Sequence, residues 1–378
     1  MKYKLEDLCI YAKEKIEVEA LTDKNYISTE NMLPNKGGIT IATSLPSTAH
    51  TQKYQQFDIL VSNIRPYFKK IWFAEFDGGC SNDVLVFRAK EGVCKRFLYY
   101  VLANDAFFDY SMATSKGTKM PRGDKAAIMK YDVPDFTYEE QEKIAGILNA
   151  LDRKIQLNAE INNKLEQQAK AIFSNEFLTL ETLPDGWKQA SLIDIADYLN
   201  GLAMQKYRPT VDETGIPVLK IKELRQGCCD DNSELCSPSI KSEYIIHDGD
   251  VIFSWSGSLL VDFWCGGICG LNQHLFKVTS NKYNKWFYYA WTKHHLDRFI
   301  AVAADKATTM GHIKREDLAK AEVLIPNNKD YDRIGALFQP IYDLIIANRI
   351  ENKKLAKTRD ALLPKLMSGE LDVSNLDI

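Results

Sequence analysis

The sequence lacks several motifs that catalytic chains carry. It contains no Pro-Pro pair, and so no Asn/Asp-Pro-Pro-aromatic motif of a methyltransferase, and it contains no G-x4-G-K-[ST] phosphate-binding loop. The glycine-rich run Gly266-Gly267-Ile268-Cys269-Gly270 has no strand–loop–helix pattern around it, so we expect a turn there. No spacing in the sequence assembles a nucleophile, a base and an oxyanion donor. We therefore expect a chain that is not itself a catalyst.

Long apolar runs are also missing. No run approaches the roughly 18 residues that a membrane helix needs. The first residues, MKYKLEDLCIYAKEK, are too charged to contain the apolar core of a signal peptide. We expect a cytoplasmic protein that does not enter a membrane.

Metal-binding spacings are absent as well. Of the eight cysteines, Cys228 and Cys229 are adjacent and Cys265 and Cys269 are separated by three residues, with no matching second pair and no supporting histidines. Structural zinc sites need two such pairs, so we expect reduced, partly buried thiols and no metal. The single pair His294-His295 falls at an expected helix end, where a surface position is more common than a ligand role.

The chain has little excess charge of either sign. The net charge is −3, with 19 basic and 17 acidic residues in 1–136 and 16 basic and 18 acidic residues in 184–326. Neither part is basic as a whole, so any contact with nucleic acid must come from local clusters or be shared with a more basic partner.

What the sequence does have is an internal repeat. Seven helical positions recur at an offset of 190 residues, two asparagines among them. They are Ile144, Leu148, Leu151, Ile155, Asn158, Asn162 and Leu165 in the first copy, and Ile334, Phe338, Ile341, Ile345, Asn348, Asn352 and Leu355 in the second. Outside the helices, Ser62 and Asn82 recur as Ser254 and Asn272, and Thr118-Lys119-Met120 as Thr308-Thr309-Met310. Two copies of one unit predict pseudo-two-fold symmetry and suit a ligand that itself has two halves.

Each copy is predicted to be a mixed α/β globular part followed by a long helix, which makes the fold class α+β. In the first copy, strand-like runs at 58–61 and 84–87 precede a helical patch at 95–102, and the second copy repeats this order at 250–253, 275–278 and 286–289. Val133-Pro134 and Ile325-Pro326 close the globular parts. The predicted domains are 1–136 (globular), 137–180 (helix), 181–326 (globular) and 327–378 (helix).

The helical positions alternate in steps of four and three, which is the 3.5-residue period of a coiled-coil seam. Two unrelated amphipathic helices packed on their own domains are the alternative. The matched asparagines argue against it, because a polar residue in an apolar seam costs stability and mainly fixes register and partner. If the helices pair antiparallel, Asn158 and Asn162 meet Asn352 and Asn348. Helices of roughly 35 residues, about 50 Å long, would hold two domains about one DNA turn apart.

The order of these parts resembles the specificity subunits of type I restriction-modification systems. The likeness covers essentially the whole chain. It includes Leu183-Pro184-Asp185-Gly186-Trp187-Lys188 at the opening of the second globular part, Leu192-Ile193-Asp194-Ile195 after it, Gly215-Ile216-Pro217, and the tail from Leu362 to Leu371. The first part lacks the Gly-Trp opening and the Gly-x-Pro turn, so its N-terminal strands are less firmly predicted than its centre.

The resemblance implies a DNA-recognising subunit without its own active site. Each globular part would be a target recognition domain for one half of a split sequence in double-stranded DNA. The helices would set the gap and dock two modification (methyltransferase) subunits, and restriction (translocase-nuclease) subunits would join them. S-adenosylmethionine, ATP and magnesium are expected in those partners and no cofactor in this chain. A protein-only scaffold is an alternative, as is the recognition part of a fused or type II-like restriction-methylation enzyme, although that enzyme would add catalytic domains beyond the two repeats.

The best candidates for DNA contact are two corresponding loops, 115–122 and 305–315, because Lys, Arg and Thr suit phosphate contacts and Arg suits guanine. The alternative for each side chain is solvated surface. The candidates in the first half are Arg65, Lys69, Lys70, Lys116, Thr118, Lys119 and Arg122; those in the second half are Lys220, Lys222, Arg225, Lys306, Thr308, Thr309, His312, Lys314 and Arg315. The bases recognised do not follow from side-chain identity.

Overall fold

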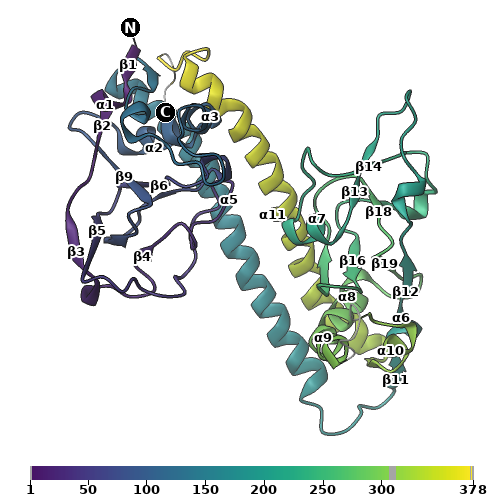
Figure 1. The fold of residues 1–378 in the computed structure, drawn as a ribbon. Helices are drawn as coiled ribbons and strands as arrows, with labels where there is room; N and C mark the ends of the chain where they lie inside the picture. Colours follow the sequence, from purple (N-terminus) through teal and green to yellow (C-terminus); the bar gives the residue numbers. More distant parts are fainter. Residues whose placement is uncertain (1, 306–311, 375, 377–378) are drawn as a thin grey trace. The chain divides into compact units, whose positions relative to one another are not determined.

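A computed structural model of the chain describes residues 2–305, 312–374 and 376. It divides into two compact units, Met1–Lys154 with Leu355–Ile378 (unit 1) and Ile155–Lys354 (unit 2). Each unit contains one globular repeat and part of each of the two long helices, α5 (Tyr138–Phe173) and α11 (Asn328–Ser368) (Figure 1). The mixed α+β class with long helices is confirmed. The four domain ranges drawn from the sequence stay a prediction, since the compact units divide within both helices.

Unit 1 opens with a strand, one helical turn and a second strand, and continues with short strands and three helices. Its elements before α5 are β1 (Lys2–Lys4), α1 (Leu5–Leu8), β2 (Cys9–Tyr11), β3 (Lys15–Glu17), η1 (Val18–Ala20), β4 (Tyr26–Ile27), β5 (His50–Tyr54), β6 (Ile59–Ser62), η2 (Pro66–Phe68), β7 (Ile71–Phe73), β8 (Gly78–Cys80), β9 (Val84–Ala89), α2 (Lys95–Ala103), α3 (Asp105–Ala113), α4 (Lys125–Ile128) and β10 (Asp132–Pro134). The predicted strands at 58–61 and 84–87 and the predicted helix at 95–102 correspond to β6, β9 and α2.

Unit 2 has the same opening and the same ending, in which three helices precede the last strand, but it has an additional helix, α7, between them. Its elements between α5 and α11 are η3 (Ser174–Leu178), β11 (Lys188–Ser191), α6 (Leu192–Ile195), β12 (Asp197–Asn200), η4 (Met204–Lys206), β13 (Ile216–Leu219), α7 (Ile221–Gln226), β14 (Leu235–Cys236), η5 (Ser242–Tyr244), β15 (Ile245–Ile246), β16 (Val251–Ser254), β17 (Leu260–Phe263), β18 (Cys269–Leu271), β19 (Leu275–Thr279), α8 (Lys285–His294), α9 (Leu296–Asp305), α10 (Arg315–Ala319) and β20 (Glu322–Ile325). The run 266–270, predicted to be a turn, is one only in part, because Cys269 begins the buried strand β18.

The first strand of each repeat pairs with its last. Strand β1 pairs antiparallel with β10, and β11 with β20. A four-stranded antiparallel sheet follows, in the order β2-β9-β6-β7 in unit 1 and β12-β19-β16-β17 in unit 2. The repeat seen in the sequence is therefore a repeat of strand order.

A second four-stranded sheet is built around a short buried strand, β8 in unit 1 and β18 in unit 2. This strand pairs parallel with β4 or β13 and antiparallel with β5 or β15. Gly79 and Gly270 lie at matching positions in it, and a Cβ atom would come within 2.5 Å of Leu21 at Gly79 and of Cys236 at Gly270. Glycine is required there because side chains from neighbouring elements cross the strand closely.

The first sheet of each repeat is buried on both faces. In unit 1, Ile59 and Val61 of β6 pack in the core with helices α2 and α3, whereas Leu60 between them packs with Tyr54 and Cys80 of the second sheet. This alternation follows from the two-residue period of a strand. The same division holds for β16 in unit 2.

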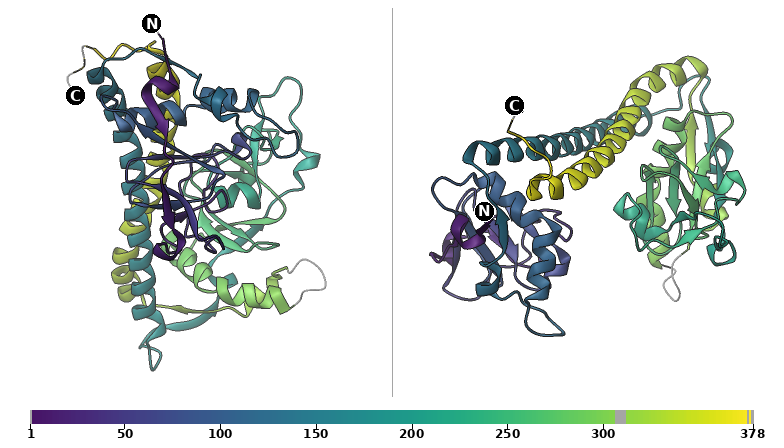
Figure 2. Two further views of the ribbon diagram at one scale, coloured as in Figure 1. Left: turned by 60° about the vertical axis from the view of Figure 1, so that its left-hand side comes forward. Right: turned by 90° about the horizontal axis from the view of Figure 1, so that it is seen from above.

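The long helices complete both cores. The start of α5 (Ile144, Leu148) and the end of α11 (Leu363, Met367) join the core of unit 1, so the chain's first strand and last helical turns belong to one unit (Figure 2). Two reciprocal hydrogen bonds between Thr137 and Glu140 cap the start of α5. Thr137 N donates to Glu140 Oε2 at 2.7 Å, and Glu140 N donates to Thr137 Oγ1 at 3.3 Å. After Phe173, the last residue of α5, the chain forms the π-helical turn η3.

Among the described residues, no helix has both the length and the apolar sequence that crossing a membrane requires.

Candidate nucleic-acid interface and helix seam

The loop 115–122 of unit 1 is a small closed hairpin. Lys116 and Arg122 exchange both backbone hydrogen bonds, at 2.9 and 3.0 Å, and Arg122 also forms a bridge with Ile64 at the end of β6. Ion pairs secure its base, with Lys116 Nζ 2.5 Å from Asp124 and Arg122 3.1 Å from Asp83. The tip residues Thr118, Lys119 and Met120 are exposed. The hairpin therefore presents a hydroxyl, an ammonium group and an apolar side chain on a fixed base.

The other candidates of unit 1 lie in the neighbouring connection between β6 and β7. Arg65 hydrogen-bonds through its backbone N to Pro121 O at 2.8 Å, which joins this connection to the hairpin. Lys69 Nζ lies 2.9 Å from Asp105 on α3. Lys70 Nζ donates to Thr29 O at 2.6 Å, and partial burial lowers the pKa of Lys70. The structure thus brings together the unit 1 candidates named from the sequence.

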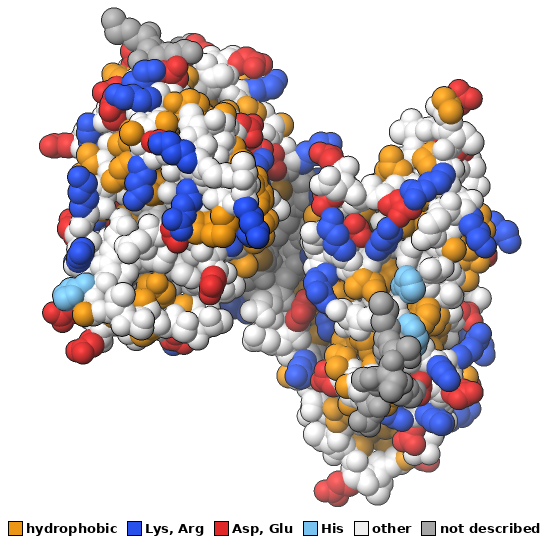
Figure 3. Space-filling view, in the orientation of Figure 1, with side chains coloured by type: hydrophobic (Ala, Val, Ile, Leu, Met, Phe, Trp, Pro, Cys, Tyr) orange, Lys and Arg blue, Asp and Glu red, His pale blue; other side chains and the backbone are white. Residues whose placement is uncertain are grey.

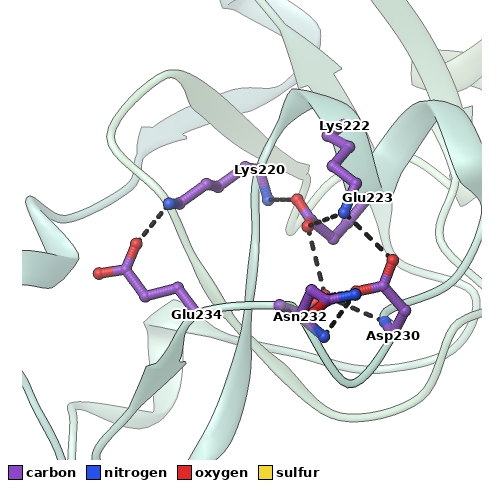
Figure 4. A network of polar contacts seen from close by, with 7 residues as sticks. Lys220, Lys222, Glu223, Asp230, Asn232 and Glu234 are labelled. Atoms are coloured by element: carbon purple, nitrogen blue, oxygen red, sulfur yellow. Dashed lines mark hydrogen bonds and ion pairs between the residues drawn. The ribbon is translucent and has the colours of Figure 1, made fainter. Parts of the chain in front are cut away.

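In unit 2, Lys220 and Lys222 belong to a polar network of the domain's own carboxylates (Figure 4). Lys220 pairs with Glu234 and Lys222 Nζ lies 3.1 Å from Asp230, which ties the start of α7 to the segment before β14. The hydrogen bond from Lys220 holds the pKa of Glu234 below its ordinary value. Arg225 is exposed on α7.

The loop 305–315 of unit 2 is only partly described. Lys306, Thr308 and Thr309 lie outside the described residues. His312 is exposed and bridges to Ser256, with its ring 5.3 Å from that of Trp255. Lys314 and Arg315 are exposed at the start of α10. The bridges of Arg122 to Ile64 and of His312 to Ser256 match, so both loops return to the strand end just beyond β6 or β16.

Neither unit has a surface of a single charge. On the face shown in Figure 3, Lys and Arg side chains lie interspersed with acidic and apolar ones on each unit. Nucleic-acid contact would therefore depend on individual loops, as the composition of the two halves indicates.

Sequence reasoning missed the aromatic side chains in these loops. Tyr67 and Phe68 are exposed in η2, and Trp255 stacks on Phe276 with ring centroids 5.6 Å apart while its indole N–H donates to Asn200 at 2.9 Å. The signal was present in Arg65-Pro66-Tyr67-Phe68-Lys69-Lys70, where two aromatic residues stand among basic ones. Only the charges were considered, because exposure of an aromatic ring cannot be judged without the fold.

The two histidines His294 and His295, both expected at the surface, lie in different environments. His294 is exposed but His295 is buried at the end of α8, where its Nε2–H donates to Glu322 O at 2.8 Å. Burial lowers the pKa of His295 to about 4. The surface expectation was wrong for His295, because the turn between α8 and α9 points its ring at the carbonyl of β20.

Antiparallel pairing of α5 and α11 brings the asparagines together. In unit 2, Asn158 Nδ2 donates to Asn352 Oδ1 at 2.8 Å and Asn348 Nδ2 donates to Asn162 Oδ1 at 2.8 Å. Further amide hydrogen bonds run from Asn162 to Ile345 O at 3.2 Å, from Asn352 to Ile155 O at 3.1 Å and from Asn158 to the Glu351 carboxylate at 2.6 Å. Asparagines placed in this way fix the register of the two helices.

The apolar seam residues divide between the seam and the globular cores. Ile144 and Leu148 are buried in the core of unit 1. Ile334, Phe338, Ile341 and Ile345 are buried in the core of unit 2. The half-buried members are Leu151, Ile155, Leu165 and Leu355. The first two positions of the first copy and the first four of the second therefore pack in the globular cores, and the later positions of each copy lie half-buried or pair as asparagines.

An arginine of α11 ties the seam to the globular part in each unit. Arg349 contacts Glu166 of α5 at 2.9 Å and Asp262 of β17 at 2.7 Å. In unit 1, Arg359 contacts Asp152 of α5 at 2.8 Å, and Tyr100 of α2 donates to the same carboxylate at 2.7 Å. These ion pairs do not follow the 190-residue offset, so they differ between the two copies.

Comparison with protein families assigns this two-copy architecture. The model of the type I restriction modification DNA specificity domain matches residues 1–167 and again residues 184–357. The chain belongs to this family. The two matches correspond to the two copies of globular repeat and helix.

Relatives in the family span most of this chain. The specificity subunit of type I restriction enzyme MjaIX from Methanocaldococcus jannaschii is 28% identical over 76% of this chain and 71% of its own length. The specificity subunit of type I restriction enzyme HindI from Haemophilus influenzae is 21% identical over 98% of this chain and 99% of its own length. The crystal structure of a type I restriction-modification S subunit from M. genitalium has a TM-score of 0.60 at 16% identity, covering 97% of this chain and 96% of that one. That structural likeness is one of fold.

Proposed function

We propose that this chain is the DNA-specificity subunit of a type I restriction-modification complex, in which each globular repeat recognises one half of a bipartite duplex target. The observation that carries the proposal is the tandem match of one specificity-domain model to two repeats of the same strand order. A ligand with two halves suits such a chain. The cytoplasm, where the DNA lies, is the location that this role requires.

The loops at the ends of β6 and β16 support DNA contact. In unit 1 the connection 65–70 and the hairpin 115–122 contain Arg and Lys side chains and no acidic residue. Cationic side chains on a fixed backbone suit phosphate oxygens, which position a protein on duplex DNA, whereas base contacts supply specificity. The exposed tip of Thr118, Lys119 and Met120 has groups for both kinds of contact.

The two long helices would set the gap between the half-sites and dock two modification (methyltransferase) subunits, with restriction (translocase-nuclease) subunits joining that assembly. The asparagine pairs support a spacer role, because a seam of fixed register has a fixed length. The proposal is that bases are recognised by the globular repeats and the gap is set by the helices.

Catalysis would belong to the partner subunits. The chain has no Pro-Pro methyltransferase motif and no phosphate-binding loop, and the described residues contain no group of three His, Cys, Asp or Glu side chains placed to hold a metal ion. S-adenosylmethionine, ATP and magnesium would accordingly be bound by the modification and restriction subunits.

The test is to map DNA methylation in cells with and without this gene and to measure binding of the reconstituted complex to duplex DNA at several salt concentrations. We expect methylation of a bipartite sequence that vanishes without the gene, and an affinity that falls with salt. A complex that assembles but binds no DNA would support a protein scaffold instead. Methyl transfer by this chain alone would show a fused or type II-like enzyme.

A further inference from the structure

Three loops of unit 1 are joined into one surface, the segments 33–37, 65–70 and 115–122, which we name the loop platform. Asn35 N donates to Phe68 O at 2.8 Å and Lys36 N donates to Lys69 O at 2.9 Å. Arg65 N donates to Pro121 O at 2.8 Å, which connects the third loop. Lys36 and Lys69 also share Asp105 of α3, at 2.8 and 2.9 Å. Although burial raises the pKa of Asp105, the two lysines hold it below its ordinary value. The platform is therefore held by backbone and ion-pair contacts.

Unusual backbone conformations gather in the loop platform. Five non-glycine residues of the described chain have positive φ, and four of them, Asn35 (55°), Lys36 (60°), Arg65 (50°) and Lys69 (50°), lie in it. L-residues rarely adopt this region, and where they do the surrounding structure must hold them; such residues concentrate at binding and catalytic sites. Arg65 and Lys69 flank the turn η2 on its two sides.

The backbone held in this way presents two aromatic rings to solvent. Tyr67 is 48% and Phe68 is 38% exposed, and their ring centroids lie 4.6 Å apart. The hydrogen bonds and ion pairs that hold the platform are made by backbone groups and by lysines, and the Phe68 ring adds a contact with Lys70 Nζ, 5.8 Å from its centroid. Two neighbouring exposed rings on a turn held by backbone hydrogen bonds are available for contact with a partner.

The chemistry around the rings identifies the partner. The three loops contain seven basic residues and no acidic one, although unit 1 as a whole is nearly balanced. Four of the seven, Lys36, Lys69, Lys116 and Arg122, pair with Asp105, Asp124 or Asp83 beside the loops, which places their cationic groups around the rings. Cations placed around two exposed rings suit a polyanion that also has flat or methyl-bearing apolar groups, which is the composition of duplex DNA. Phenylalanine and similar side chains contact the thymine methyl group in the major groove.

We propose that Tyr67 and Phe68 contact base edges in a groove of duplex DNA, while the basic residues of the loop platform hold the phosphates on either side. This proposal rests on the proposed function and deepens it. The pair determines the preference at one or two neighbouring base pairs of the half-site that unit 1 recognises, and at least one of these is an A·T pair.

In the described part of unit 2, the corresponding connection has one aromatic residue, Trp255, and no pair of neighbouring exposed rings. The connection between its strands β16 and β17 is five residues long (255–259), against eight in unit 1 (63–70), and contains Trp255, Ser256, Gly257, Ser258 and Leu259. Gly257, with φ of 65°, makes its turn without a side chain. The other half-site is therefore independent of this aromatic contact.

The experiment compares the full chain with Tyr67→Ala/Phe68→Ala, each assembled with the modification subunits, by sequencing which sites are methylated in a randomised target library. We expect the double variant to lose about tenfold or more of its preference at one or two adjacent base pairs of one half-site. The rest of that half-site, the gap and the other half-site keep their preference.

Two control variants define the effect. Tyr3→Ala removes a similarly exposed tyrosine (40%) from β1 of the same unit and should leave every preference unchanged. Lys119→Ala should lower methylation of all targets alike, because a phosphate contact does not distinguish bases. If the double alanine variant loses its unfolding transition, Tyr67→Leu/Phe68→Leu keeps the apolar volume and should still shift the preference at the same base pairs.

Three outcomes would overturn the proposal: unchanged preference in a folded double variant, a uniform loss at all positions like that of Lys119→Ala, or a shift in both half-sites. If the unaltered chain methylates a bipartite target and the variants do not change it, only the aromatic contact is refuted. If the unaltered chain directs no bipartite methylation, the proposed function fails and this inference fails with it.

Discussion

In both repeats the first antiparallel sheet has the same strand order, whereas the second sheet adds its fourth strand at opposite ends. Strand β3 lies beside β5 in unit 1, but β14 lies beside β13, the counterpart of β4, in unit 2. One face of the first sheet packs against the helices and the other face packs against the second sheet. The strands of the second sheet continue into the surface loops, and the two repeats differ in those loops.

The same contrast holds for the segments that follow the parallel strand of the second sheet. After β4, unit 1 has the irregular segment that contains Asn35 and Lys36 of the loop platform. After β13, unit 2 has α7 and the ion network of Lys220, Lys222 and Asp230. At this place unit 1 has backbone with positive φ and unit 2 has a helical turn and paired charges. The exposed rings of unit 1 lie elsewhere, in the connection between β6 and β7. The repeats therefore differ in both connections, as the proposed recognition of different half-sites would require.

The largest effect on stability is expected at the arginine that ties the seam to unit 2. Arg349→Ala leaves Glu166 and Asp262 without their shared cation, and we expect a loss of about 3 kcal/mol, because removing one partner strands the other charges. Hydrogen exchange followed by mass spectrometry should show the loss in peptides of unit 2.

Arg333→Ala is a comparison variant. It removes a bidentate pair with Glu176, whose side chain is only 13% exposed, and so tests a second ion pair of unit 2. Lys130→Ala removes an exposed pair with Glu6 in unit 1 and should cost less than about 1 kcal/mol. Arg359→Ala is the counterpart of Arg349→Ala in unit 1 and should raise exchange mainly there. Equal protection in Arg349→Ala and the unaltered chain would contradict the structural role given to this contact.

A pH effect is expected in unit 2 and not at the equivalent place in unit 1. The pKa of His295 is lowered by burial to about 4, so below about pH 6.5 the unfolded chain binds a proton that the folded chain does not. Stability therefore falls as the pH decreases, by about 2 kcal/mol between pH 7 and pH 5. The exposed His294 and Arg298 nearby act in the same direction on this pKa.

Asn104, between α2 and α3, occupies the corresponding junction of unit 1 and does not titrate. Urea unfolding at several pH values should show that the free energy of unfolding of the unaltered chain decreases as the pH falls. In His295→Asn this dependence on pH should be absent. A slope that survives this substitution would assign the pH dependence to other groups.

The smallest effect is expected in the seam. Asn348→Leu strands the side-chain oxygen of Asn162, at a cost of about 1 kcal/mol, whereas Asn348→Leu/Asn162→Leu replaces both members of the pair and should recover that loss. The double variant should nevertheless loosen the register, because the specific polar contact is gone. Thermal unfolding reports the first effect and the length of the methylated gap reports the second. A double variant less stable than the single one would show that the pair stabilises the helices directly.

Much of this fold followed from the sequence because it is repeated or periodic. The offset of 190 residues located both long helices, and apolar runs located β6, β9, β16 and β19. The second sheet could not be predicted, because β4, β14 and β15 are only two residues long and are defined by distant partners. A strand of two residues is too short to show the alternation of apolar and polar side chains from which a strand is predicted.

The sequence named candidate residues for the site, and the structure shows how the described ones lie without testing their role. The basic loops were found from charge, and the structure joins Arg65 to the hairpin 115–122. The sequence alone does not show which side chains are buried or paired. Lys220 has a carboxylate partner 14 residues away in the chain. Tyr67 is exposed on a turn whose flanking residues, Arg65 and Lys69, have positive φ. Whether the named residues contact DNA stays a prediction.

The most direct test of the account is to exchange residues 1–136 for the corresponding repeat of a relative and map the methylated sequence. The exchange keeps β1 and β10 together, so the pairing that closes the repeat is retained. Recognition by separate repeats predicts that one half-site changes entirely while the other half-site and the gap stay the same. A change in both half-sites would contradict it.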